Sequence, residues 1–242
     1  MTEHWDVEEL PEEQEITINL KTGHLSTIID NYILDNPDME LRKYIGASSI
    51  GHPCERKLWY GYQGITATPV APSTRRTFDI GRVLERLVLD YLAAAGLPLV
   101  REPKQLSFKD KDVPQLQGNL DALWIKNESP TNPYAVIEIK TARDSSFNVF
   151  KRQGLQKWYP IYYSQVQTYM GLSNVKEAYI IAINKDTSEL HDELVNFNEG
   201  HYQLIRSKAL RIINATETPP KINVNPCYFV CRTCVYKSMC HA

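Results

Sequence analysis

The hydrophobic positions along the chain change period several times, which predicts a mixed succession of helices and strands. Apolar residues at helical spacing predict helices at 24–34, 53–62, 74–95, 161–172 and 198–214. Alternating or continuous apolar runs predict strands at 98–102, 104–108, 116–124, 134–140, 175–184 and 189–197. Because these elements follow one another without an interrupting linker, we expect an α/β fold with one central mixed sheet flanked by helices.

The long helix that we expect from Thr74 to just before Gly96 carries a carboxylate at the border of its apolar stripe. With about 100° per residue, that stripe consists of Leu84, Leu87, Val88, Tyr91 and Leu92. Glu85 falls beside the stripe, where a carboxylate is costly to bury unless it is paired or binds a metal ion. The alternative is an ordinary boundary glutamate that extends into solvent. Gly81 disfavours a helix and indicates the close approach of another backbone.

Residues 117–141 combine a predicted β-hairpin with a group of charged side chains. Two apolar runs flank a polar connection that contains Pro and Asn, which is typical of a hairpin. Side chains two apart in a strand share a face, so Glu138 and Lys140 point the same way and Asp121 can reach them from the facing strand. Two carboxylates beside an ammonium suit a hard divalent ion such as Mg²⁺. The alternative for the common Glu-x-Lys pattern is a solvated cross-strand ion pair.

Composition and charge exclude a membrane span and single out the N-terminus. The chain has 242 residues, 43% of them hydrophobic, and no apolar run approaches the length of a bilayer crossing. The N-terminus is acidic and does not resemble a secretory signal, so we expect a cytoplasmic protein. Residues 1–15 hold seven acidic residues and no Lys or Arg, which leaves 27 basic against 22 acidic residues in the remainder.

The charge block divides the chain into two expected regions. We expect residues 1–22 to form a disordered, solvated acidic tail and residues 23–242 to form one domain. A sharper alternative for the tail is that it mimics a polyanion and competes for a basic groove on the domain.

The cysteines predict a metal centre, because clustered thiols in a reducing compartment bind metals more often than they form disulfides. Four of the five lie close together near the C-terminus, at Cys227, Cys231, Cys234 and Cys240. One possibility is a zinc site formed by these four, with His241 as a spare ligand and Cys54 as a bystander. The other is a four-iron, four-sulfur cluster held by Cys54, Cys231, Cys234 and Cys240. The spacing alone does not decide between them.

An ordered series of short motifs resembles the PD-(D/E)XK nuclease superfamily, and within it the RecB-like iron–sulfur branch. That branch includes AddB-type nuclease domains, the exonucleases of CRISPR adaptation and many phage exonucleases. Residues 48–60, Ser-Ser-Ile-Gly-His-Pro-Cys-Glu-Arg-Lys-Leu-Trp-Tyr, are similar to its N-terminal cysteine motif. The other matching motifs, in order, are Gly81-x3-Glu85, Gly118-Asn-Leu-Asp121, Glu138-Ile-Lys140, Gln165-x3-Tyr169 and Cys231-x2-Cys234-x5-Cys240.

The resemblance implies a restriction-endonuclease-like fold with a C-terminal cluster-binding appendix, and a metal-dependent active site. Residues 47–62 and 227–241 would form the cluster-binding parts. The resemblance implies that Mg²⁺ or Mn²⁺ is held by Asp121, Glu138, the Ile139 backbone carbonyl and Glu85. It also implies catalytic roles for Lys140, Gln165 and Tyr169, of which the last two share one face of the predicted 161–172 helix. It favours Cys54 over Cys227 as the fourth cluster ligand.

The resemblance further implies hydrolysis of DNA phosphodiester bonds. We expect an exonuclease that acts on single strands or DNA ends in recombination, repair, or phage or CRISPR DNA processing, with a possible protein partner in such a complex. The segment 143–160 suits a groove that contacts phosphates and bases; its candidate DNA contacts are Arg143, Lys151, Arg152, Lys157, Trp158 and Tyr159. For Trp158 and Tyr159, packing in the core is an equal alternative. The alternative for the whole chain is a nucleic-acid-binding zinc-knuckle protein, or a subunit with an inactive nuclease-like fold.

Overall fold

The strands of the chain form two mixed sheets, which a computed structural model describes for residues 24–37, 43–101, 106–126 and 131–242. The expected acidic tail and the tip of the expected hairpin lie outside these residues. The larger sheet has the order β2-β5-β6-β7-β8 and consists of β2 (Leu99–Val100), β5 (Ala122–Ile125), β6 (Tyr134–Ala142), β7 (Glu177–Asn184) and β8 (Leu190–Asn196). In this sheet β6 and β7 run parallel, whereas the other neighbours are antiparallel.

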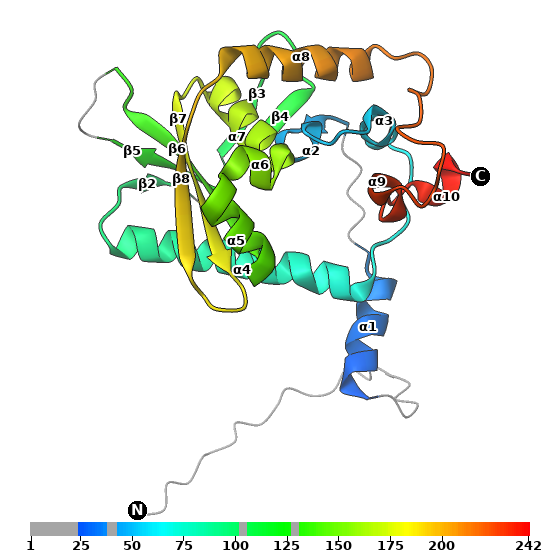
Figure 1. The fold of residues 1–242 in the computed structure, drawn as a ribbon, viewed down its shortest axis with the longest axis horizontal. Helices are drawn as coiled ribbons and strands as arrows, with labels where there is room; N and C mark the ends of the chain where they lie inside the picture. Colours follow the sequence, from blue (N-terminus) through cyan, green and yellow to red (C-terminus); the bar gives the residue numbers. More distant parts are fainter. Residues whose placement is uncertain (1–23, 38–42, 102–105, 127–130) are drawn as a thin grey trace, which may run out of the picture.

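The smaller sheet has the order β1-β4-β3 and consists of β1 (Ile45–Gly46), β4 (Leu116–Leu120) and β3 (Leu106–Lys109). Helices surround both sheets (Figure 1): α1 (Leu25–Asp35), α2 (Ala47–Ile50), α3 (Glu55–Tyr62), α4 (Pro72–Ala94), α5 (Asp144–Gln153), α6 (Leu155–Trp158), α7 (Pro160–Ser173), α8 (Glu199–Ile213), α9 (Phe229–Arg232) and α10 (Lys237–Cys240). Within the described ranges, no helix combines the length and the apolar character that a bilayer crossing requires.

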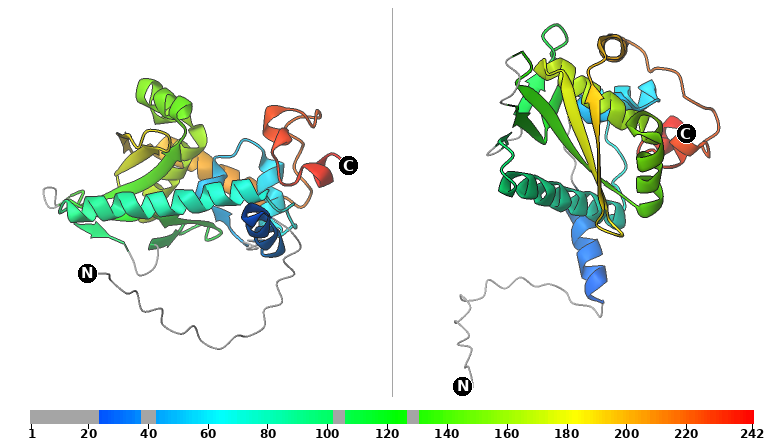
Figure 2. Two further views of the ribbon diagram at one scale, coloured as in Figure 1. Left: turned by 90° about the horizontal axis from the view of Figure 1, so that it is seen from below. Right: turned by 60° about the vertical axis from the view of Figure 1, so that its left-hand side comes forward.

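The two faces of the larger sheet are covered by different helices, as Figure 2 shows for α4 and α5. On one face, Val88 and Leu89 of α4 pack against Ile137 and Ile139 of β6. On the other face, apolar side chains of α5, α6 and α7 pack against alternate residues of β6, β7 and β8; they include Phe147, Phe150, Leu155, Val166 and Met170. Burial on both faces explains why β6 and β7 read as continuous apolar runs.

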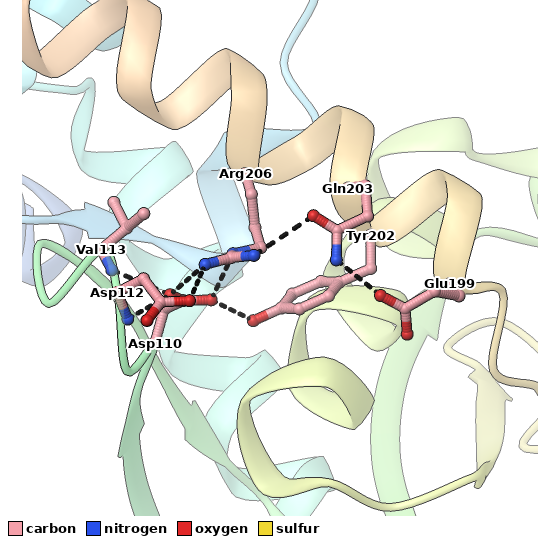
Figure 3. A network of polar contacts seen from close by, with 7 residues as sticks. All are labelled: Asp110, Asp112, Val113, Glu199, Tyr202, Gln203 and Arg206. Carbon is pink, nitrogen blue, oxygen red and sulfur yellow. Dashed lines mark hydrogen bonds and ion pairs between the residues drawn. The ribbon is translucent and has the colours of Figure 1, made fainter.

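The smaller sheet has its own core and is fastened to α8. Buried apolar residues of α2, α3 and α8 pack together with those around β1 and β4. Beside this core, the Tyr202 hydroxyl of α8 donates to Asp110 Oδ2 at 2.6 Å, and the Val113 N–H donates to Asp110 Oδ1 at 2.8 Å. Arg206 Nη2 also donates to Asp110, at 3.2 Å (Figure 3). Burial favours a higher pKa for Asp110, but these hydrogen bonds and the Arg206 charge outweigh it and lower the pKa.

The mixed α/β fold flanked by helices is confirmed, with corrections to two of its elements. The run predicted as one strand over 116–124 is two strands, β4 and β5, which belong to different sheets. In α4, Leu87 and Tyr91 are exposed, and the side facing the sheet carries Leu84, Val88, Leu89 and Leu92 instead. The close backbone approach expected at Gly81 is not seen, because a Cβ there would meet Thr141 Oγ1 at an ordinary 3.8 Å.

Candidate functional site

Asp121 lies where the chain leaves the smaller sheet and enters the larger one. It belongs to neither β4 nor β5, and the pairing of β5 with β6 ends at Ala122 opposite Ile137. Beyond that point β6 continues without β5 beside it, and Asp121 Oδ2 accepts the Ile139 N–H at 2.8 Å. A carboxylate therefore takes the place of a strand partner at this free edge of β6. Because the N–H and C=O of a strand residue point to the same side, the Ile139 carbonyl also points to this edge.

Glu138 and Lys140 share one face of β6, as the sequence predicts, and form an ion pair there. Glu138 is 1% exposed. Its Oε1 accepts from the Lys140 ammonium and from Gln165 Nε2, the latter at 2.8 Å. Its Oε2 is buried and has no hydrogen-bond partner among the described residues. A buried carboxylate oxygen without a hydrogen-bond partner costs free energy. A ligand from outside the protein would remove this cost.

Gln165 and Tyr169 occupy one face of α7, directly over Glu138. Gln165 Nε2 donates to Glu138 Oε1 and also lies 2.8 Å from the Tyr169 hydroxyl, so the amide bridges the two groups. Burial, followed by repulsion from Glu138, raises the pKa of Tyr169 well above its usual value, which keeps it a neutral phenol. Gly118 of β4 leaves room for this ring, because a Cβ at that position would lie 2.7 Å from Tyr169 Cε1.

Glu85 of α4 completes a chain of three carboxyl groups. Glu85 and Glu138 both lie close enough to Asp121 to repel its charge. Burial and then repulsion from Asp121 raise the pKa of Glu85 to about 7, and the same two causes raise the pKa of Glu138 to about 8. Burial also raises the pKa of Asp121. Three mutually repelling carboxyl groups at one place share protons unless a cation neutralises them.

Lys140 contacts the aromatic ring of Tyr162, a residue that lies outside the motifs in the sequence. Its ammonium lies 4.7 Å from the centroid of the Tyr162 ring. Burial favours a lower pKa for Lys140, but the charges of Glu138 and Asp121 outweigh it and raise the pKa, so the side chain stays charged. Tyr162 precedes Gln165 by three residues and Tyr169 by seven, and this helical spacing is the signal that could have revealed it.

The donor set at this edge fits a hard divalent cation. The carboxyl groups of Glu85, Asp121 and Glu138, together with the Ile139 carbonyl, are oxygen ligands of the kind that Mg²⁺ and Mn²⁺ prefer. Within the described part of the chain Glu138 Oε2 has no hydrogen-bond partner, as expected of an atom that is free to bind a metal ion. Among the described residues no group of three or more His, Cys, Asp or Glu side chains already surrounds a common point suited to a metal ion. Instead, Asp121 lies between Glu85 and Glu138. The Lys140 ammonium lies close enough to these carboxyl groups to offset part of their negative charge.

The basic and aromatic segment after β6 separates into exposed and buried side chains. Arg143, Arg152 and Lys157 are exposed. Lys151 is also exposed but forms an ion pair with Glu189. Tyr159 is 42% exposed and lies against Tyr162, with ring centroids 4.1 Å apart.

Trp158 corrects one expectation for this segment. It is 9% exposed and stacks on Phe150, with ring centroids 4.5 Å apart. Its indole N–H donates to Ser146 Oγ at 2.7 Å. Both the ring and its donor are therefore used inside the protein, and Trp158 packs in the core instead of stacking on a base.

Four of the five cysteines line one pocket between α3 and the C-terminal helices. These are Cys54, Cys231, Cys234 and Cys240, whereas Cys227 is exposed and does not line it. Burial, then the nearby charges of the other three thiols, raises the pKa of Cys231. Arg56 Nη1 lies 3.8 Å from Cys240 Sγ, and the Thr68 N–H donates to the Val235 carbonyl at 2.9 Å. The tail is thus docked against the N-terminal part of the domain, as Figure 1 shows.

Comparison with known proteins identifies the fold. No family model matches the sequence, and no curated protein matches it. Among solved structures, the alkaline exonuclease LHK-Exo from Laribacter hongkongensis has a TM-score of 0.53 and 14% sequence identity, over 72% of this chain and 87% of that chain. LHK-Exo in complex with dAMP has a TM-score of 0.54 and 13% identity, over 74% and 90%. The protein SSO0001 has a TM-score of 0.54 and 18% identity, over 90% and 96%. At these identities the likeness establishes the fold alone: this chain has the fold of the alkaline exonuclease.

Proposed function

We propose that this protein is a metal-dependent deoxyribonuclease that hydrolyses phosphodiester bonds. The observation that carries the proposal is the convergence of Glu85, Asp121 and Glu138 with the Lys140 ammonium at the free edge of β6. The unpaired Glu138 Oε2 supports it, because a bound cation would satisfy that atom. The two named exonuclease structures that share the fold, one of them with dAMP, agree with DNA as the substrate.

Each residue at this edge has a specific task in the proposed reaction. Asp121, Glu138, Glu85 and the Ile139 carbonyl would hold Mg²⁺ or Mn²⁺. When bound, the ion supplies a Lewis acid for a phosphoryl oxygen and lowers the pKa of a bound water. Lys140 stabilises the negative charge that develops on the phosphate. Gln165 and Tyr169 hold Glu138 in place through the hydrogen bonds described above.

We further propose that the protein acts as an exonuclease on single strands or DNA ends. The exposed Arg143, Arg152 and Lys157 follow β6 directly and suit phosphate contacts. Tyr159 presents a partly exposed ring beside Tyr162, and such a ring can stack on an unpaired base.

The nuclease proposal is tested by replacing Lys140 and a matched lysine on the same sheet. We expect Lys140→Ala to lower the rate of cleavage of end-labelled DNA by about 10²–10³-fold, the usual effect of removing one group that stabilises transition-state charge. Lys126→Ala is the control, because Lys126 pairs with Glu177 away from this edge. DNA binding in a chelator should persist in both variants. Full activity of Lys140→Ala would show that cleavage occurs elsewhere.

We also propose that the cysteine pocket holds a [4Fe–4S] cluster. Thiolates are the usual cluster ligands, and the four that line the pocket are those of the cluster arrangement, whereas the zinc alternative requires the exposed Cys227. We expect Cys54→Ser to lose the visible absorbance and most of the bound iron, and Cys227→Ser to keep both. Colourless wild-type protein with one equivalent of zinc, unaffected by Cys54→Ser, would support the zinc site instead.

A further inference from the structure

A second pocket adjoins the cysteine pocket, with which it shares Cys234, Lys237 and His241, and lies next to the start of α4. Its walls are the 68–71 loop and Thr74 on one side and residues 232–241 on the other. Three cationic or protonatable side chains line it: Arg232, Lys237 and His241. Hydroxyl groups of Thr68, Thr74, Thr233 and Ser238 also line it, and none of the described residues in its lining is Asp or Glu. Cations and hydroxyl donors without a competing carboxylate suit an anionic chain such as a nucleic-acid backbone.

This second pocket is an open groove. One face of α4 leads from the groove to the carboxyl groups of the candidate active site. Successive residues of a helix turn by about 100°. Phe78, Gly81 and Glu85 follow Thr74 by four, seven and eleven residues, so all four lie within about 60° of arc. Thr74 lines the groove, whereas Glu85 interacts electrostatically with Asp121. The groove and the active site are therefore the two ends of one helical face.

The middle of that face carries an exposed ring followed by a glycine. Phe78 is 52% exposed on α4, so its ring is accessible from outside the protein. Gly81, the next residue on the face, has no side chain, and a Cβ there would have Thr141 Oγ1 as its neighbour, at 3.8 Å. Thr141 follows Lys140 on β6. At the step before Glu85 this face of α4 therefore lies close to β6.

We propose that a single strand of DNA enters through the groove formed by Thr74, Arg232, Lys237 and His241 and runs along α4 to the carboxyl groups, with one base stacked on Phe78. The inference rests on the proposed nuclease function and adds a substrate path to it. Arg232 and Lys237 contact phosphates, and Phe78 provides a sequence-independent stacking surface.

The length of the path sets the length of strand that it binds. Eleven residues at about 1.5 Å each separate Thr74 from Glu85 by about 16 Å. At about 3.4 Å per stacked nucleotide, that distance corresponds to about five nucleotides. Affinity should therefore rise as an oligonucleotide is lengthened through about this size.

The experiment measures fluorescence anisotropy of labelled oligo(dT) strands of 3 to 12 nucleotides in a metal chelator, so that binding is observed without cleavage. We expect Phe78→Ala to weaken binding of the longer strands about tenfold, within the range for losing one base–aromatic contact. The double variant Arg232→Gln/Lys237→Gln should lower the slope of log affinity against log salt by about 1.4, because each phosphate contact to a single strand contributes about 0.7.

Matched controls separate the path from general effects. Tyr91→Ala removes an exposed ring from a different face of the same helix, and Lys111→Gln removes an exposed charge near the smaller sheet; both should bind like wild type. Iron content and urea denaturation show whether each variant is folded. If Phe78→Ala and the double variant bind all lengths like wild type, the path is wrong even when cleavage is intact. If both lose affinity but wild type cleaves no DNA with Mg²⁺ or Mn²⁺, the path stands and the nuclease proposal fails.

Discussion

Glu138 offers a direct test of the electrostatics at the free edge of β6, because its replacement should affect stability and activity in opposite directions. The substitution Glu138→Gln keeps the size and one oxygen of the side chain but removes its charge. Its neighbours at this edge include the carboxyl groups of Asp121 and Glu85 and the ammonium of Lys140. The variant therefore isolates the free energy of placing a third carboxylate here.

The size of the effect follows from the raised pKa of Glu138. A carboxyl group whose pKa is higher in the folded state contributes fully below its ordinary pKa of 4.5, and this contribution is lost as the pH rises toward the folded-state value of about 8. Each pH unit in this interval corresponds to about 1.36 kcal/mol. Between pH 4.5 and pH 7, ionisable Glu138 therefore lowers the free energy of unfolding of the metal-free protein by about 3 kcal/mol.

The assay is urea denaturation in a chelator at pH 5 and pH 7, followed by tryptophan fluorescence. We expect Glu138→Gln to be more stable than wild type by about 3 kcal/mol at pH 7 and by less than about 1 kcal/mol at pH 5. Glu189→Gln is the control, because Glu189 is an exposed partner of Lys151 and surface pairs contribute at most about 1 kcal/mol.

The same variant should lose its response to the metal. Mg²⁺ or Mn²⁺ should stabilise wild type through preferential binding to the folded state, and Glu138→Gln should show little of this stabilisation and no measurable cleavage. A variant that is less stable than wild type at pH 7, or whose stability difference does not change with pH, would refute the reasoning.

Three further predictions concern residues that support the site. Tyr202→Phe removes a hydrogen bond to the ionised Asp110 and should lower the free energy of unfolding by about 1.5–3 kcal/mol in urea denaturation at pH 7. Because the pKa of Asp110 lies below its ordinary 3.8 in the folded state, wild type should lose this extra stability as the pH falls through that region. An equal difference in stability at all pH values would contradict the assignment. Gly118→Ala places a Cβ against the Tyr169 ring and should lower stability by about 1–3 kcal/mol together with the cleavage rate; wild-type values of both would show that the ring has room to move. Trp158→Ala should cost about 3–5 kcal/mol through lost packing with unchanged DNA affinity in the folded protein, and weaker DNA binding without loss of stability would restore the stacking role.

Local patterns in the sequence predicted much of the candidate site. The alternation of side chains along β6 placed Glu138 and Lys140 on one face, and the four-residue spacing in α7 placed Gln165 beside Tyr169. These predictions succeed because each depends on the geometry of a single element, which repeats every two residues in a strand and about every 3.6 residues in a helix.

What only the tertiary structure decided concerns relations between elements. The run 116–124 looks like one strand, but its two halves pair with different partners, and the break leaves Asp121 at the edge of β6. Likewise, Leu87 and Tyr91 fit an apolar stripe on α4 but face solvent, whereas Trp158 could be a surface ring but is covered by Phe150.

The cysteines divide in the same way. Their number and spacing in the sequence predicted a metal centre, but the spacing was compatible with two sets of four. The fold brings Cys54 to the C-terminal thiols and leaves Cys227 exposed. The periodicity of a segment predicts which of its side chains share a face. Whether that face is buried, and against which residues, depends on the distant segment that packs on it.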